Sequence, residues 1–525
     1  MAAVKQLYFN WTASRMCASS NGGAAREKGP SAQAPLSILI PAMHGTAHLP
    51  KLIAVCKQLA PLEIIVISKR TLELGAGIRV VPAEDAENLF SWRREAAKHA
   101  RGSVLLFLGE EQIDSLSGLQ RFLFPILYGK AQVVLPQHDS RNRKLIKPQP
   151  IHSFSLLVNN LFGRSDLREA SLLDTPHAMT REALSKIGVE QLAQPAQAHK
   201  RAVVGGLSIT AQIIGTGTEE RLFLPQLHGS LLKELSLYEK LVIAEQLDLV
   251  SHLPFRGGLS DGGRRRDLAE NVSGTNSGIP VTQVGKWPLR QTSLYSGKAV
   301  SVIIPALNEA ATIQQVIREV LRLEPVEIIV VVNGSDDQTA QLARECGATT
   351  VEFPYALGVD TGRAIGASLA KGDILLFVDA DVIMTAHDLY PFVLACQRGV
   401  DVALNDVSAF LNQPCADNVF VACRQALNLA LNRKDLGIGS MVTVPFALRR
   451  EAVAPLGWPI LLCPPKAQAV YAQAGVKMEL VHQVNSFSSN RLRPEKHFAS
   501  SGMPPAVEQI AGDHVEALQF LVKGR

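Results

Sequence analysis

Apolar positions in the second half of the chain alternate between two periods. Four short runs are rich in β-branched and aliphatic residues, which is typical of buried strands. Between them, apolar residues recur every three or four positions, as on one face of an amphipathic helix. We predict strands at 300–305, 327–332, 349–353 and 374–378, and helices at 312–323, 339–346 and 360–370. This alternation indicates a parallel sheet covered by helices, which binds its ligands at the carboxyl ends of the strands.

The same pattern occurs twice along the chain. Residues 35–252 align with residues 299–522 at an offset of about 264 to 270 residues. The matching segments include 37–42 with 301–306 and 101–107 with 371–377. A nearly constant offset across separated segments indicates an internal duplication. We therefore predict two α/β domains in tandem, at 35–253 and 299–525, after a flexible N-terminal tail at 1–34.

The segment between the two copies has a different composition. Residues 254–298 are rich in Gly, Ser, Asn and Arg and show no apolar period. We predict that this segment is an inter-domain linker. Its run Arg264-Arg265-Arg266 is interpreted as a solvated charge cluster, with a basic docking patch as the alternative.

Composition restricts the class of protein. The chain has 525 residues, of which 47% are hydrophobic and 19% charged, so it is long enough for two domains and too apolar for wholesale disorder. Its net charge of +5 is too small to indicate nucleic acid binding. The seven cysteines are scattered and include no CxxC pair. The sequence shows no signal-peptide core, and no apolar run approaches the roughly 20 residues of a membrane span. These features predict a cytoplasmic protein. A peripheral contact with a membrane surface stays open.

The strongest chemical motif is Asp379-Ala380-Asp381, which follows directly on a predicted strand. A divalent cation that bridges a diphosphate requires hard oxygen ligands, and two carboxylates one residue apart can supply them. We predict a Mg or Mn site formed by Asp379 and Asp381. The alternative is an acidic turn that caps the next helix.

Two further polar turns follow neighbouring strands of the predicted sheet. Asn333, Gly334 and Asp337 lie after the second strand, and Asn308 and Glu309 lie after the first. A plain strand-to-helix cap requires only one such polar residue, so their density favours a binding site. We expect all three turns to open on the same edge of the sheet.

In this order and spacing, the segments 303–309, 332–339 and 377–381 resemble glycosyltransferase family 2. The resemblance implies a GT-A fold, a nucleotide-diphosphate sugar donor and usually a Mg or Mn ion. It covers about 110 residues strongly. It implies that the donor nucleotide and its diphosphate are bound around Pro305, Asn308, Glu309, Asn333, Gly334, Asp337, Arg363 and Asp379, with Asp381 as the catalytic metal ligand. Asn333 stands where many members have Asp.

The acceptor half departs from the family pattern. Inverting members usually carry a Glu-Asp pair that supplies a base, whereas the comparable residues 461–470 contain no carboxylate. Another residue supplies that base, or the enzyme retains configuration and requires none. The candidates are Asp406 and Asp513 as acceptor-side carboxylates, His482 as a third metal ligand, and Arg491 and Arg493 as cations for a diphosphate or phosphorylated acceptor. For His482 the alternative is polar surface, and for the arginines it is a solvated basic loop.

The first copy has lost these polar turns. Gly109-Glu110-Glu111 replaces the Asp379 motif, the Asn333 turn is shortened to Ser68-Lys69-Arg70 and its neighbours, and His44-Gly45 replaces Asn308-Glu309. Scaffold positions persist while positions at the ligand edge change. We favour an inactive scaffold for this copy. A domain that binds the acceptor or a partner, or a transferase that uses Glu110 and Glu111, remains an alternative.

These observations predict metal-assisted transfer of a sugar from a nucleotide-diphosphate donor to an acceptor that the sequence does not identify, whether a carbohydrate, a lipid-linked molecule or a phosphorylated small molecule. A nucleotidyltransferase is less favoured, because the turn at 305–309 lacks the Gly-rich basic loop expected after its first strand. A non-catalytic tandem protein that binds sugar nucleotides is the other alternative.

Overall fold

The computed structural model of the chain describes residues 34–43, 45–47, 49–83, 89–109, 116–137, 150–213, 235–271, 281–283, 298–409, 419–486, 494, 498–499 and 502–523. The chain divides near residue 250 into two compact units, which are described separately. Among the described residues, no helix combines the length and apolar character required to cross a membrane.

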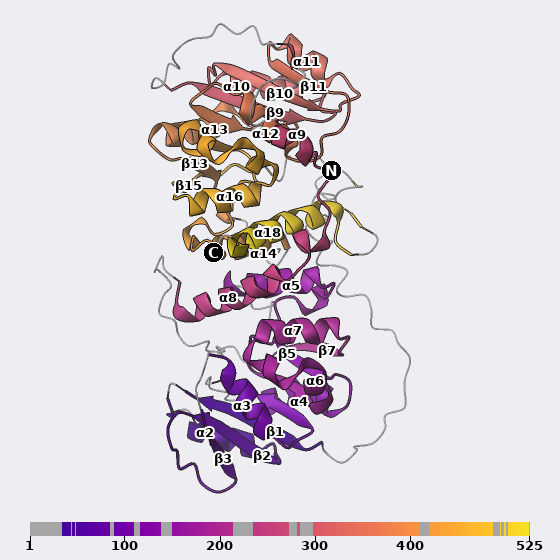
Figure 1. Ribbon diagram of the computed structural model, residues 1–525, viewed down its shortest axis with the longest axis vertical. Coiled ribbons are helices and arrows are strands. Elements are labelled where there is room, and N and C mark those ends of the chain that lie inside the picture. Colours follow the sequence, from indigo (N-terminus) through magenta and orange to yellow (C-terminus); the bar gives the residue numbers. More distant parts are fainter. Residues whose placement is uncertain are drawn as a thin grey trace. The chain divides into compact units, whose positions relative to one another are not determined.

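The first unit contains a seven-stranded mixed sheet in the order β3-β2-β1-β4-β6-β5-β7, in which β6 is antiparallel to both of its neighbours. Figure 1 labels β1, β2, β3, β5 and β7 of this sheet. Its strands are β1 Leu36–Ala42, β2 Glu63–Ser68, β3 Ile78–Pro82, β4 Val104–Phe107, β5 Val133–Gln137, β6 His177–Thr180 and β7 Ile209–Ile213. Its helices are α2 Leu49–Lys57, α3 Ser91–His99, α4 Leu116–Leu127, α5 Ser153–Leu161, α6 Arg181–Ile187 and α7 Pro195–Val204, with α8 Leu237–Ser251 at the division.

The second unit contains an eight-stranded sheet in the order β15-β13-β14-β12-β9-β10-β11-β8. Its strands are β8 Val281–Gln283, β9 Val300–Ala306, β10 Glu327–Asn333, β11 Thr349–Phe353, β12 Ile374–Phe377, β13 Val402–Asn405, β14 Phe446–Arg449 and β15 Met478–His482. Its helices are α9 Arg266–Asn271, α10 Ile313–Leu321, α11 Thr339–Glu345, α12 Thr361–Leu369, α13 Ala386–Gln397, α14 Val419–Ala430, α15 Arg450–Val453, α16 Pro464–Gln473 and α18 Pro505–Lys523.

The two sheets have the same strand order once β8 is set aside. Read from β11 to β15, the second sheet repeats the first from β3 to β7, including one antiparallel strand at the same position. Strand order is set by long-range pairing, so this agreement is independent of the sequence match. The prediction of two tandem α/β domains is confirmed, and the four strands and three helices predicted in the second copy are all present.

A buried serine has the same contacts in both copies. The Ser301 hydroxyl donates to Glu327 Oε1 at 2.6 Å and accepts from the Gly372 N–H at 2.8 Å. In the first unit, Ser37 donates to Glu63 Oε1 at 2.7 Å and accepts from the Gly102 N–H at 2.8 Å. Each serine therefore ties the first strand of its sheet to the second strand and to the turn before the fourth.

Removal of this hydroxyl is expected to cost the same in both units. Ser37→Ala and Ser301→Ala each leave a buried glycine N–H without its acceptor, which lowers the free energy of unfolding by about 1–3 kcal/mol. Chemical denaturation of the full chain measures the loss. Ser103→Ala is the control, because this exposed hydroxyl has only a 3.4 Å bond to the Pro35 carbonyl. Equal stability of all three variants would contradict the expectation.

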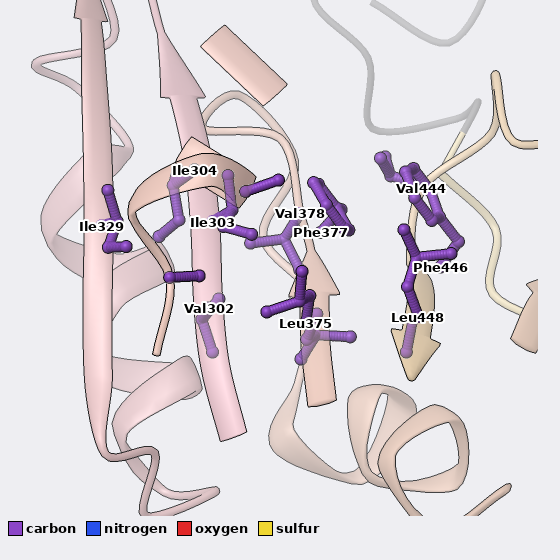
Figure 2. Packing of buried hydrophobic residues seen from close by; sticks show 14 of the residues in the cluster. Val302, Ile303, Ile304, Ile329, Leu375, Phe377, Val378, Val444, Phe446 and Leu448 are labelled. Atoms are coloured by element: carbon purple, nitrogen blue, oxygen red, sulfur yellow. The ribbon is translucent and has the colours of Figure 1, made fainter. Parts of the chain in front are cut away.

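The core of the second unit centres on β9, β10 and β12 and on a stacked aromatic pair. Phe377 on β12 and Phe446 on β14 face each other (Figure 2), and their ring centroids are 4.5 Å apart. In the first unit Phe107 stacks on His177 at 4.7 Å in the same register. In the second unit, the chain continues from Phe377 through Val378 to Asp379. The stacked rings of Phe377 and Phe446 therefore anchor the strand that leads to the acidic motif.

The predicted linker is not structureless in the residues that the structure describes. Residues 255–258 form a tight turn in which Arg256 and Gly257 have positive φ, α9 follows, and β8 adds an antiparallel strand to β11. Arg264 is buried, and its guanidinium hydrogen-bonds to Asp261, Asp360 and Asp513. The interpretation of the Arg264-Arg265-Arg266 run as a solvated cluster is therefore wrong for Arg264, because buried carboxylates compensate its charge.

Candidate functional site

Three polar turns lie at one edge of the second sheet, as predicted. β9 is paired in parallel with both β10 and β12, so the carboxyl ends of these strands point the same way. The first two turns bond to each other: the Asn308 N–H donates to Ser335 Oγ, and the Asp336 N–H donates to Asn308 Oδ1, each at 3.0 Å. The turns after β9 and β10 therefore form one hydrogen-bonded unit, to which Pro305 at the end of β9 leads.

Asp337 and Glu309 add further hydrogen bonds to these two turns. Asp337 Oδ2 accepts the Ala310 N–H at 3.0 Å, and Oδ1 accepts both the N–H and the hydroxyl of Thr339. Burial alone would raise the pKa of Asp337, but these hydrogen bonds outweigh it and lower the pKa. The Glu309 N–H donates to Thr339 Oγ1 at 2.7 Å, and the Glu309 side chain is buried. These acidic residues shape the turns, and their predicted contact with a nucleotide stays a prediction.

Asn333 and Gly334 hold the loop that follows β11. The Asn333 amide donates to the Gly358 carbonyl at 3.0 Å and accepts the Leu357 N–H. Gly334 has a φ of +69°, and a Cβ at this position would lie 2.5 Å from the Tyr355 carbonyl carbon. A larger residue would push the loop away from the sheet edge. Asn333 therefore shapes the site through its loop contacts, and direct contact with a nucleobase would require exchanging them.

Asp379 and Asp381 lie two and four residues beyond Phe377, the last residue of β12, and both are partly exposed. Asp379 Oδ1 accepts a hydrogen bond from Arg363 Nη2 at 2.9 Å, whereas Oδ2 accepts none from the described residues. Arg363 is buried on α12, and its guanidinium also lies 5.9 Å from the centre of the Phe446 ring. Burial alone would lower the pKa of Arg363, but the Asp379 and Asp360 carboxylates outweigh it and raise the pKa.

The donor set of this motif fits a hard divalent cation. Two carboxylates at a strand end supply oxygen ligands, which Mg and Mn prefer, and water or diphosphate oxygens complete such sites. Within the described residues, no group of three or more His, Cys, Asp and Glu side chains is arranged to hold a metal. His482 is therefore not brought together with the Asp pair. Its ring lies edge-on to Phe392 of α13, with centroids 6.4 Å apart.

The two other acceptor-side carboxylates, Asp406 and Asp513, lie in different surroundings. Asp406 follows β13, where its N–H donates to the His482 carbonyl and its carboxylate accepts the Ser408 N–H at 3.0 Å. Asp513 is wrongly predicted as an acceptor-side carboxylate, because its side chain is 2% exposed and arginines occupy both oxygens. The helix α18 also runs through Gly512 without interruption. Arg491 and Arg493 lie outside the described residues, as do His44, Glu110 and Glu111 of the first copy.

Sequence reasoning missed Asp360 and Arg264. Asp360 Oδ1 accepts from Arg363 at 2.7 Å, and Oδ2 accepts from Arg264 at 2.9 Å. Asp360 lies immediately before α12 with a φ of +63°, so an acidic residue at a predicted helix start was the available signal. Arg264 had no such signal, since its surroundings have the composition of a linker.

The chain was compared with known proteins. Residues 301–411 match the family model of glycosyl transferase family 2. The family resemblance of this segment is confirmed. The matched residues contain all three polar turns, from Asn308 to Asp381, together with Asp360 and Arg363. The segment that matches family 2 therefore includes the sheet edge described above.

Curated relatives match less than a fifth of the chain. Glucosyl-3-phosphoglycerate synthase of Mycobacterium tuberculosis is 39% identical over 105 residues, which are 18% of this chain and 32% of the relative. The 4,4'-diaponeurosporenoate glycosyltransferase of Staphylococcus haemolyticus is 37% identical over 92 residues, which are 16% and 24% of the two chains. The match thus spans about a third or less of the length of these relatives.

Among solved structures, the M. tuberculosis glucosyl-3-phosphoglycerate synthase in complex with Mn2+ and uridine-diphosphate-glucose is 24% identical. The match covers 38% of this chain and 73% of that chain, with a TM-score of 0.30.

Proposed function

We propose that the second unit transfers a sugar from a nucleotide-diphosphate donor to an acceptor hydroxyl with the help of Mg or Mn. One observation carries the proposal: the Asp379 and Asp381 pair ends a strand beside two polar turns, within a segment that matches glycosyl transferase family 2. A carboxylate pair at this place is suited to the metal ion that accompanies a sugar nucleotide.

The side chains divide the work between holding and orienting. Asp379 and Asp381 would hold the cation, which when bound supplies positive charge to the leaving diphosphate. Arg363 fixes one oxygen of Asp379, so the carboxylate has a defined orientation before a ligand arrives. The turns at 306–310 and 333–339 form the adjacent wall, where the nucleoside of the donor would lie.

The acceptor is the less determined half of the reaction. Residues 461–470, where inverting members carry their acidic pair, contain Pro464 and Pro465 at the start of α16. Asp406 is the described carboxylate that we retain as an acceptor-side candidate, because it follows β13 and is partly exposed. The relatives are named for 3-phosphoglycerate and 4,4'-diaponeurosporenoate, which are both carboxylates, so an acidic small molecule is the first acceptor class to test.

For the first unit we propose a scaffold without transfer activity, within domain boundaries near those predicted. Gly109 replaces Asp379 in the repeat, so the arginine that corresponds to Arg363 cannot form the same ion pair there. This residue, Arg93, instead donates to the carbonyls of Leu172 and Leu173, each at 2.8 Å. The arginine is retained in this copy, but the aspartate that corresponds to Asp379 is not.

A screen of the purified chain against common sugar nucleotides tests the transferase proposal. We expect one UDP-sugar or GDP-sugar to raise the melting temperature in the presence of Mn2+ or Mg2+, and to be hydrolysed or transferred. A ligand at a hundred times its Kd stabilises the folded state by about 2.7 kcal/mol. Stabilisation without turnover, with every acceptor class tested, would favour the non-catalytic binding protein. No metal-dependent binding of any donor would refute the proposal.

A further inference from the structure

Residues 255–266, called here the arginine strap, lie against two elements of the second unit. One is α18, and the other is the loop 357–360 that precedes α12. The strap precedes the family 2 segment in sequence, yet it contacts the loop that leads to Arg363. It therefore belongs to the same unit as the acidic motif.

Backbone and side-chain hydrogen bonds join the strap to the loop. The Arg265 N–H donates to the Leu357 carbonyl at 2.9 Å, and Arg264 Nε donates to the Val359 carbonyl at 3.1 Å. Gly358 has a φ of +80°, and a Cβ there would lie 2.4 Å from the Gly263 carbonyl carbon. Such an approach requires glycine on the loop, so the loop is shaped to receive the strap.

Arg264 connects α18 to the acidic motif through a chain of ion pairs. Its guanidinium bonds to both oxygens of Asp513 at 2.7 Å and to Asp360 Oδ2 at 2.9 Å. Asp360 Oδ1 accepts from Arg363 at 2.7 Å, and Arg363 donates in turn to Asp379 at 2.9 Å. The Arg264 side chain has no exposed surface, while those of Asp360 and Arg363 are 8% exposed.

The geometry of this series of ion pairs indicates that Arg264 helps to position Asp379. Guanidinium groups present their donors in a rigid fork, and buried ion pairs are weakly screened, so each member restricts the orientation of the next. Arg363 is buried and donates to both Asp360 and Asp379. If Asp360 were not held by Arg264, a small movement of either aspartate would change the position of the Arg363 guanidinium. Arg264 fixes Asp360 from the opposite side, so Arg363 presents a fixed donor to Asp379.

The first copy supplies an internal comparison. Arg93 corresponds to Arg363, but the positions of Asp360, Asp379 and Asp513 are occupied by Phe90, Gly109 and Ala244. The three carboxylates of the chain are thus absent together from the copy that lacks the acidic motif. Arg93 lies 5.2 Å from the centre of the Phe90 ring. The fold therefore forms without the ion-pair chain, which accompanies the metal motif and is not required by the sheet.

We propose that Arg264 is a positioning residue of the metal-binding site, through Asp360 and Arg363, and that the rest of the arginine strap only holds Arg264 in this place. This inference rests on the proposed transferase function. It assigns to a segment outside the family 2 match a role in orienting Asp379 toward the cation.

The test compares UDP binding with and without Mn2+ by calorimetry on the full chain, with GDP as the second probe. In the wild-type chain Mn2+ is expected to tighten nucleotide binding. Arg264→Met should reduce this metal-dependent gain at least tenfold and leave the metal-free Kd nearly unchanged. Asp360→Asn, which breaks the chain one step closer to the motif, should have the same effect. A merely structural loss would weaken binding equally with and without metal.

Arg266→Met is the matched control, because Arg266 lies on the same strap and pairs with Asp261 and Glu516. It should leave the metal-dependent gain unchanged. Melting temperatures identify variants that do not fold, and the Asp360 variant then decides. An unchanged gain in Arg264→Met and Asp360→Asn would overturn the positioning role, as would an equal loss in Arg266→Met. If the wild-type chain binds neither nucleotide in a metal-dependent way, the proposed function fails first and the inference with it.

Discussion

Asp381→Ala is expected to lower metal-dependent sugar transfer by at least about a hundredfold, because groups that stabilise developing charge contribute that much to turnover. Asp381 lies in the turn after β12, and its carboxylate is one of two at this strand end that can supply an oxygen to the cation. The loss should appear mainly in kcat and in the concentration of Mn2+ required, since the polar turns that we propose as the nucleoside site remain.

Asp373→Ala is the control for this change. Asp373 is exposed at the opposite end of the same strand, where its carboxylate accepts the Ala299 N–H at 2.8 Å. It removes the same charge from the unit without touching the site, and activity should stay within about twofold, as for most surface substitutions. Equal activity of Asp381→Ala and Asp373→Ala would rule out the acidic pair as the metal site.

Asp513→Ala is expected to lower the free energy of unfolding by about 3–5 kcal/mol, the usual cost of leaving a buried charge without its partner. Arg256 and Arg264 both donate to Asp513, at 2.6 and 2.7 Å, and neither guanidinium is accessible to water. Glu516 and Asp360 can compensate part of this charge, so the loss should stay below the sum of two unpaired arginines. Urea denaturation of the full chain measures it.

An exposed pair from the same strap region gives the contrast. Arg265 and Asp267 bond at 2.6 Å, but their side chains are 42% and 57% exposed. Asp267→Ala should therefore change stability by no more than about 1 kcal/mol. If Asp513→Ala cost as little as Asp267→Ala, the buried cluster would not hold the strap against α18, and the interpretation of the strap as part of the second unit would lose its main support.

The sequence determined the sheets and the place of the acidic motif, because these depend on local pattern. Alternation of apolar runs and helical periods gave β9 to β12 and α10 to α12 nearly to the residue. The carboxyl ends of parallel strands must lie at one edge, so the sequence also predicted that Asn308, Asn333 and Asp379 follow strands that end together. The repeat predicted a second sheet, which has the same strand order.

Only the tertiary structure decided which side chains are partners in hydrogen bonds, ion pairs and packing contacts. Arg264 and Asp513 are 249 residues apart in sequence, and no local pattern indicates that a run of arginines in a Gly-rich segment meets a helix near the other end of the chain. The same holds for Asn333, whose amide bonds to the loop at 357–358, and for His482, which lies against Phe392. Side-chain partners are chosen by packing across the whole unit. The sequence therefore determined where the acidic motif lies, and the tertiary structure decided how this motif is held.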